Sequence, residues 1–153
     1  MFDDSSSKAA KRLEQIIGII NDNDKESLKE LFSQKSLDDS DYFDENLDHL
    51  FEYIQGEITS WEKSSGPSVS ESNNYGHKKR EVNSFYFLTT DTQKYFFLIT
   101  DFPIDDDNPD NVGLYLLLVV KSEDREKIYD GDYKILYDGD NDIIRSGIYI
   151  PFE

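Results

Sequence analysis

Two copies of the tetrapeptide Tyr-Asp-Gly-Asp lie near the end of the chain, at positions 129–132 and 137–140. Carboxylates spaced in this way could bind calcium, which is held by oxygen ligands. A helix-loop-helix calcium loop also needs glycine at its sixth position and glutamate at its twelfth. When the loop is counted from Asp138, these positions hold Ile143 and Tyr149, so the pattern fails at both.

A second acidic run fails the same test. Counted from Asp106, the sixth position is Asn111 and the twelfth is Leu117. Asp-Gly is foremost a turn dipeptide, because glycine accepts positive φ angles and aspartate hydrogen-bonds to its own backbone. The two copies are also too close together to be a structural repeat. We therefore expect turns and no metal site at both copies, with a weak cation site as the alternative.

Other side chains that could do chemistry are few. The absence of cysteine excludes disulfides, thiolate zinc sites and cysteine nucleophiles. No serine-nucleophile, phosphate-loop or HExxH motif is present. His49 lies beside an apolar stripe, and His77 adjoins the basic run Lys78–Arg80, so we expect both near the surface. The basic run suits an edge strand, with a small anion site as the alternative. The residues predict no catalytic group and no cofactor.

Composition predicts one folded, strongly acidic domain. The 153 residues are 37% hydrophobic and 14% aromatic, enough for a single core. The net charge is -17, from 33 acidic and 16 basic residues, so nucleic acid and anionic lipid surfaces should be repelled. Such a chain suits a basic partner protein, or high solubility with no partner. The longest apolar run, 114–120, is far shorter than the roughly 18 residues that span a bilayer.

Helical periodicity dominates the first half of the chain. A first helix is expected where apolar residues recur from Ala10 to Ile20, with Ser5–Ser7 as its N-cap. A short second helix carries Leu28 on its apolar face and ends near Ser36. A longer third helix, capped by Asp44, has the strongest amphipathic stripe. That stripe consists of Leu47, Leu50, Phe51, Ile54, Ile58 and Trp61.

The second half has the two-residue period of strands. Strands are expected at 81–90, 94–102, 113–121 and, more briefly, 147–151. Residues 64–76 are rich in Ser, Gly and Pro and predict a loop, with at most a short edge strand near Val69. A helical turn is expected at 123–129. The order predicts an α+β fold, in which three N-terminal helices pack on a curved antiparallel sheet.

Both faces of this sheet are apolar. Phe85, Phe87 and Ile99 alternate with Tyr86 and Leu88, so the face away from the helices also needs cover. A homodimer formed through that sheet face would supply it.

Three segments carry a resemblance to a known family: 24–33 (DKESLKELFS), 108–115 (NPDNVGLY) and 146–151 (SGIYIP). With the helix and strand order, they resemble uncharacterised bacterial lipoproteins with the nuclear-transport-factor-two-like fold, the cystatin-like cone of ketosteroid isomerases. The resemblance implies a polar tether at 1–8 and one cone-shaped domain at 9–153. It also implies an extracellular protein, anchored to the membrane by a lipid on an upstream cysteine; a cytoplasmic protein is the alternative.

The cone of this fold can hold a small molecule, and isomerase relatives place an Asp or His inside it. Tyr53, Trp61, Phe87, Asp101 and Tyr115 are the candidates to line such a pocket. Without a catalytic constellation, we expect a binding domain for an unknown small molecule or protein. The alternatives are an enzyme that uses the cone pocket, or an acidic immunity-type protein that neutralises a basic partner.

Overall fold

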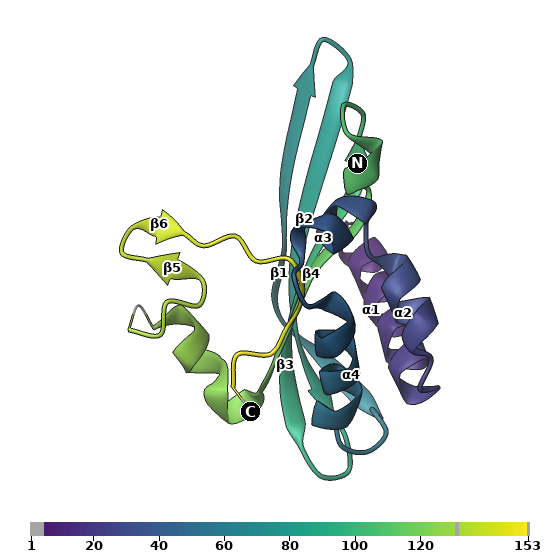
Figure 1. The fold of residues 1–153 in the computed structure, drawn as a ribbon, viewed down its shortest axis with the longest axis vertical. Helices are drawn as coiled ribbons and strands as arrows, with labels where there is room; N and C mark the ends of the chain where they lie inside the picture. Colours follow the sequence, from purple (N-terminus) through teal and green to yellow (C-terminus); the bar gives the residue numbers. More distant parts are fainter. Residues whose placement is uncertain (1–4, 131, 153) are drawn as a thin grey trace.

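The computed structural model of the protein describes residues 5–130 and 132–152. Over these residues the chain forms four α-helices, a five-stranded sheet and a two-stranded hairpin. Helices α1 (Ser5–Asn21), α2 (Lys25–Leu31) and α4 (Phe43–Tyr53) lie on one side of the sheet, which we call the inner face (Figure 1). The C-terminal segment, residues 122–130 and 132–152, lies mainly on the opposite, outer face, although residues 147–149 join the sheet as its fifth strand, and we call this segment the arm. The α+β fold class is as predicted.

The helices form where apolar residues recur along one face. They are α1 (Ser5–Asn21), α2 (Lys25–Leu31), α3 (Gln34–Asp39) and α4 (Phe43–Tyr53). The first stripe is confirmed, because α1 buries Leu13, Ile16 and Ile20. Ser5–Ser7, the predicted cap, lies inside α1, so residues 5–8 of the predicted tether are helical. Residues 1–4 of that tether lie outside the described residues.

The predicted second helix is in fact two helices. α2 ends at Leu31, and Ser33 then caps α3 by accepting a hydrogen bond from the Ser36 backbone N–H at 3.0 Å. Between them the chain runs beside the sheet, where the Ser33 N–H donates to the Leu114 carbonyl at 2.8 Å. Gly113 makes this approach possible, because a Cβ there would lie 3.0 Å from the Leu31 carbonyl oxygen.

The predicted third helix was too long and its cap was wrong. α4 ends at Tyr53, and Asp44 lies in its first turn without capping it. The stripe continues past the helix end because Ile58 is also buried, although it lies in extended chain. The Asn21 side chain holds that chain in place. Its Nδ2 donates a hydrogen bond to the Ile58 carbonyl at 3.0 Å, and its Oδ1 accepts one from the Ile58 N–H at 2.9 Å. Trp61 lies in a strand.

The main sheet has the order β1-β2-β3-β4-β7. Its strands are β1 (Ser60–Asn74), β2 (His77–Thr89), β3 (Lys94–Asp105), β4 (Gly113–Lys121) and β7 (Gly147–Tyr149). The first four pair antiparallel, as predicted. β7 is the exception, because it pairs parallel to β4. The predicted helical turn at 123–129 is the 3-10 helix η2 (Ser122–Tyr129), and a second 3-10 turn, η1 (Pro109–Asn111), precedes β4.

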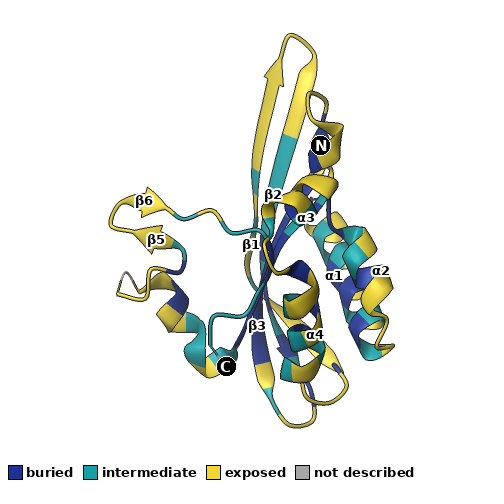
Figure 2. Ribbon diagram, in the orientation of Figure 1, coloured by how far each residue is buried: buried dark blue, intermediate teal, exposed yellow. Residues whose placement is uncertain are grey.

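The predicted loop at 64–76 is wrong. Residues 64–74 belong to β1, which pairs with β2 with register shifts between Lys63 and Ser65 and between Ser65 and Ser68. Tyr75 and Gly76 form the hairpin tip, both with positive φ, and the adjoining part of the hairpin is exposed (Figure 2). Ser, Gly and Pro are accepted here because β1 is an edge strand with little to bury.

Two apolar clusters lie on opposite faces of the sheet. The inner cluster joins the helices to alternate sheet residues such as Leu88, Phe97 and Leu117, all of which are buried. The outer cluster joins the intervening residues, such as Phe96, to Ile128 and Ile135 of the arm. Burying one such side chain stabilises the fold by about 1.5–3 kcal/mol. The arm therefore supplies cover for the outer face, and a homodimer through this face stays a prediction.

The second Tyr-Asp-Gly-Asp copy is confirmed as a turn. It joins β5 (Tyr137–Asp138) to β6 (Asn141–Asp142), and Gly139 has a φ of +64°. In the first copy, Gly131 lies outside the described residues. There the Asp130 side chain accepts a hydrogen bond from the Asp132 N–H at 3.0 Å.

Candidate ligand-binding site

The sheet changes register where β3 passes Asp101. The β2–β3 pairing shifts between Arg80 and Val82, and the β3–β4 pairing shifts between Thr100 and Asp101. The second shift inserts Tyr115 as an extra residue in β4. Extra residues of this kind bend a strand and redirect side chains. Here the two faces of the sheet each carry a hollow, one lined by Asp101 and the other by Tyr115.

The hollow on the inner face, which we call the inner pocket, has a volume of about 270 Å³. It lies between the first turns of α1 and strands β2 and β3. Its walls are mainly apolar and include Ala9, Val82, Ile99, Pro103 and Ile104. This volume is close to the lower end of the roughly 300–1,000 Å³ typical of small-molecule sites.

An ion pair forms the polar wall of the inner pocket. Arg12 Nε of α1 donates to Asp101 Oδ2 of β3 at 2.8 Å, and Arg12 Nη1 donates to Gln15 Oε1 at 3.0 Å. The two charged side chains are 26% and 16% exposed. The other carboxylate oxygen, Asp101 Oδ1, is buried and has no hydrogen-bond partner within the described part of the chain. A buried oxygen without a hydrogen-bond donor lowers the stability of the fold by about 1–3 kcal/mol or more, and a donor that reaches it removes this penalty.

A second arginine lines the inner pocket. Arg80 Nη2 donates to Ser5 Oγ at 2.6 Å, which ties β2 to the start of α1. Arg80 Nε lies 3.0 Å from Glu71 Oε1. Each arginine therefore faces one carboxylate, so the charges of these two pairs are balanced.

The hollow on the outer face, which we call the outer groove, is larger, at about 620 Å³. One side is the outer face of β2, β3 and β4, with Phe85, Phe102 and Tyr115 among its residues. The opposite side is the arm, with Tyr129, Tyr137 and Ile144. The groove exists because the middle of the arm stands away from the sheet, between η2 and β7 (Figure 1).

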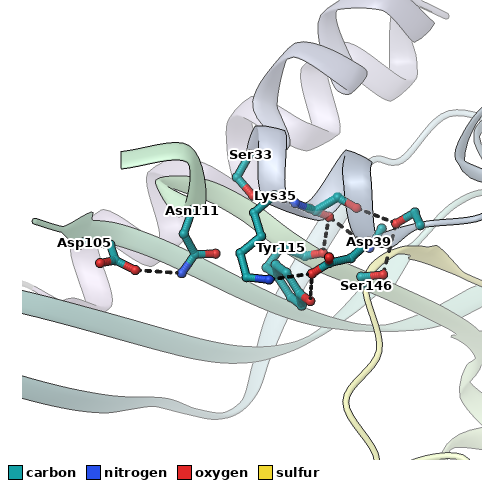
Figure 3. Close-up of polar contacts among 10 residues, drawn as sticks. Ser33, Lys35, Asp39, Asp105, Asn111, Tyr115 and Ser146 are labelled. Atoms are coloured by element: carbon teal, nitrogen blue, oxygen red, sulfur yellow. Dashed lines mark hydrogen bonds and ion pairs between the residues drawn. The ribbon is translucent and has the colours of Figure 1, made fainter. Parts of the chain in front are cut away.

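One end of the outer groove is polar (Figure 3). The Tyr115 hydroxyl donates to Asp39 Oδ2 at 2.7 Å, and Lys35 Nζ donates to the same oxygen at 2.9 Å. Burial, followed by the hydrogen bond to Asp39, raises the pKa of Tyr115 to about 12. The hydrogen bonds from Lys35 and then Tyr115 lower the pKa of Asp39.

Serine hydroxyls fix the elements behind this end (Figure 3). Ser36 Oγ donates to the Tyr115 carbonyl at 2.6 Å and accepts from the Gly147 N–H at 3.1 Å. Ser40 and Ser146 are joined by a hydroxyl–hydroxyl hydrogen bond of 3.1 Å. These bonds join α3, β4 and the start of β7 beside the backbone of Tyr115.

A buried asparagine also lines the outer groove. Asn111 Nδ2 donates to Asp105 Oδ2 at 3.0 Å, which fixes the orientation of the amide. Its Oδ1 is buried without a partner in the described residues, as is Asp101 Oδ1 in the inner pocket.

The structure does not bring the five predicted pocket residues together. Asp101 lines the inner pocket, and Tyr115 lines the outer groove. Phe87 packs against the outer cluster, and Trp61 packs edge-on against Tyr86 at 5.4 Å between ring centroids. The Tyr53 hydroxyl accepts a hydrogen bond from the Lys121 N–H at 3.0 Å, and burial raises the pKa of Tyr53 to about 12.

Arg12, the partner of Asp101, is not predicted from the sequence. Arg12 lies 89 positions away in a run of helical polar residues, and nothing in its local sequence distinguishes it. The two histidines lie apart from both hollows. His77 Nδ1 is exposed and lies 2.7 Å from Asp107 Oδ1, and His49 packs edge-on against Tyr53.

The described residues contain no helix long and apolar enough to cross a membrane. In the same residues, no three acidic, histidine or cysteine side chains converge as a metal ion would require.

Comparison with known proteins places the chain in a family. No curated protein matches it. The family described as a domain of unknown function (DUF5104) matches residues 15–122, which is more than half of the chain. The matched segment runs from α1 to the end of β4, and the arm follows it almost entirely outside the match. The chain therefore belongs to the DUF5104 family.

Proposed function

We propose that this domain binds a small molecule in the inner pocket without transforming it. The observation that carries this proposal is Asp101 Oδ1, a buried carboxylate oxygen without a donor beside an apolar hollow. Buried polar atoms in folded proteins nearly always have a hydrogen-bond partner. A ligand that enters the pocket and donates one hydrogen bond would supply it.

The charges of the pocket indicate the kind of donor. Arg12 already balances the charge of Asp101. A cationic ligand would place a second positive charge in a site whose described lining offers no second carboxylate, which is unfavourable. A neutral hydroxyl or amide N–H satisfies the oxygen without this cost. Together with the apolar walls, this favours a small neutral molecule with one donor group.

The lining supports binding rather than catalysis. Its described carboxylate is Asp101, which is engaged with Arg12, and the described lining includes no histidine or tyrosine. General acid–base catalysis needs a group placed to exchange a proton with the substrate. A substrate in this pocket would face the Asp101 carboxylate, which is held by the Arg12 guanidinium and is therefore poorly placed to exchange a proton.

We further propose that the domain is displayed outside the cell by a lipid anchor. This proposal rests on the resemblance to bacterial lipoproteins. Reading the codons upstream of Met1 tests it directly. A lipobox cysteine preceded by a signal peptide is the expected result, and a promoter and start codon without a lipobox would contradict it.

Matched fragments test the binding proposal. Benzyl alcohol and benzamide carry a donor, whereas toluene has a similar apolar body without one. In a 15N NMR titration we expect the first two to shift the amides of Ala9, Val82 and Asp101, and toluene to bind more weakly. Asp101→Asn should reduce binding of the donor fragments about tenfold. Asp106→Asn, on the exposed loop, is the control for charge removal.

Two results would contradict the proposal. Toluene could bind as tightly as benzyl alcohol, or Asp101→Asn could leave binding unchanged. Thermal unfolding of both variants shows whether the fold is intact.

A further inference from the structure

We propose that the outer groove is a second binding site, selective for a small aromatic molecule with a single negative charge. The site is separate from the inner pocket, because the sheet lies between them. This inference does not depend on the function proposed above. It rests on the rings that line the groove, on two cations at its sides and on the modest net charge of the lining.

Aromatic side chains line both walls of the groove. On the sheet, Phe102 and Tyr115 meet edge to face, with 5.8 Å between ring centroids. On the arm, Tyr129 and Tyr137 are 37% and 41% exposed, and Ile144 is 82% exposed. Large apolar side chains left open beside a cavity favour burial by an apolar ligand. Rings on both walls favour a flat one.

Two cations at the groove have no carboxylate partner within the described residues, although the chain has a net charge of -17. Lys79 Nζ lies over the Phe102 ring, 5.4 Å from its centroid. Arg145 donates from Nε to the Ile135 carbonyl at 2.9 Å and from Nη2 to the Lys134 carbonyl at 2.8 Å. These backbone contacts orient the guanidinium without neutralising it, so its charge is available to an anion.

The rest of the lining limits the charge of the ligand. Glu81 and Asp142 also line the groove, and Lys35 is already paired with Asp39. A polyanion such as a nucleotide would be repelled by these carboxylates and by the acidic chain as a whole. An aromatic ligand with a single carboxylate or sulfonate would pack its ring against the aromatic side chains of the groove. Its charge would then lie near Lys79 and Arg145.

The dye 1-anilinonaphthalene-8-sulfonate is a suitable probe, because it is aromatic and carries one negative charge. Its neutral analogue N-phenyl-1-naphthylamine has a similar body without the charge. We expect the protein to bind the sulfonate saturably with one site, and the neutral analogue about tenfold more weakly. Fluorescence titration measures both affinities. Amide shifts at Tyr115 and Ile144 in an NMR spectrum locate the bound dye.

Variants sharpen the test. Lys79→Gln and Arg145→Gln should each weaken sulfonate binding about three- to tenfold and leave the neutral analogue unaffected. Lys11→Gln removes the same charge from the exposed side of α1 and should change neither. Near-ultraviolet circular dichroism confirms that each variant is folded, since partly folded proteins also bind this dye.

Several outcomes would overturn the proposal. The sulfonate and the neutral analogue could bind equally, or Lys11→Gln could weaken binding as much as Arg145→Gln. The protein could also show no saturable binding of the dye. Asp101→Asn separates this proposal from the previous one, because it should weaken the neutral donor fragments and leave the sulfonate unaffected.

Discussion

The two faces of the sheet differ in how they are covered. Helices pack along the inner face, and the inner pocket beside α1 has a volume of about 270 Å³. The arm packs on the outer face through η2 and joins the edge of the sheet through β7, and the segment between them leaves a groove of about 620 Å³. We infer that packing on the inner face provides most of the free energy of folding. The outer face buries less apolar surface, because the groove beside it stays open.

Adjacent phenylalanines of β3 test this difference most strongly. Phe97 is fully buried on the inner face, and Phe96 is fully buried on the outer face. We expect Phe97→Ala to lower the free energy of unfolding by about 4 kcal/mol and Phe96→Ala by about 3 kcal/mol. Urea unfolding of both variants measures the difference. An equal or larger loss for Phe96→Ala would show that the outer cluster contributes as much as the inner one.

The attachment of the arm gives the next largest effect. Ile128 is the buried residue of η2, and the Arg125 guanidinium lies over the Phe96 ring, 5.1 Å from its centroid. Ile128→Ala should cost about 2–3 kcal/mol, chiefly by detaching the arm rather than by unfolding the sheet. Hydrogen exchange should therefore accelerate in residues 122–130 and 132–152 more than in β3. Equal acceleration in both regions would mean that arm and sheet unfold together.

The ion pair of the inner pocket has a smaller expected effect. A double-mutant cycle with Arg12→Ala and Asp101→Asn should give a coupling energy of about 1–2 kcal/mol. The pair is less exposed than surface pairs, which contribute less than about 1 kcal/mol, but it is not fully buried. Lys35 and Asp39 form a more exposed pair for comparison, and their coupling should be below about 0.5 kcal/mol. Similar values for the two pairs would remove the distinction between them.

The smallest effect concerns alkaline pH. The pKa of Tyr115 is raised to about 12 in the folded protein, from an ordinary value of 10.0. The folded state therefore holds this proton more tightly, which adds stability below pH 10 that is lost as the pH rises from about 10 to about 12. Tyr115→Phe should lose stability less steeply over this interval, and the ultraviolet titration should lack one late tyrosine. Tyr53 on the inner side, also raised to about 12, should still titrate late.

A Tyr115→Phe titration that matches the wild type would contradict the role given to burial and Asp39. Tyr75, which is 98% exposed at the hairpin tip, offers the matched control. Tyr75→Phe removes one phenol at the hairpin tip, away from the residues that line the outer groove.

Periodicity predicted those elements whose side chains are buried on one face. The apolar stripe of α1 and the boundaries of β4 follow directly from the sequence. The end of α4 does not, because Ile58 keeps the helical spacing although it is buried in extended chain. β1 was missed because its stabilisation comes from backbone pairing with β2, and exposed Ser and Asn side chains carry no periodic signal. The Asn-Tyr-Gly sequence at 74–76 was the available sign of a hairpin.

The candidate sites were less predictable than the fold. Asp101 was selected because it ends an apolar segment, and the structure places it beside the inner pocket. Its contact with Arg12 depends on how α1 crosses the sheet, which no local pattern specifies. The outer groove depends on the arm, where short strands and turns follow one another with little periodicity. The family match likewise ends at residue 122, where the arm begins.

The projecting β1–β2 hairpin provides a place for chemical attachment. Its tip stands apart from the body of the domain, and a side chain added at Gly76 would touch nothing within 4 Å (Figure 1). Because the chain has no cysteine, Tyr75→Cys would create a unique thiol. Maleimide coupling through this thiol would immobilise every molecule in the same orientation on a sensor surface. The inner pocket and the outer groove, on opposite sides of the sheet, would then both remain open to solution.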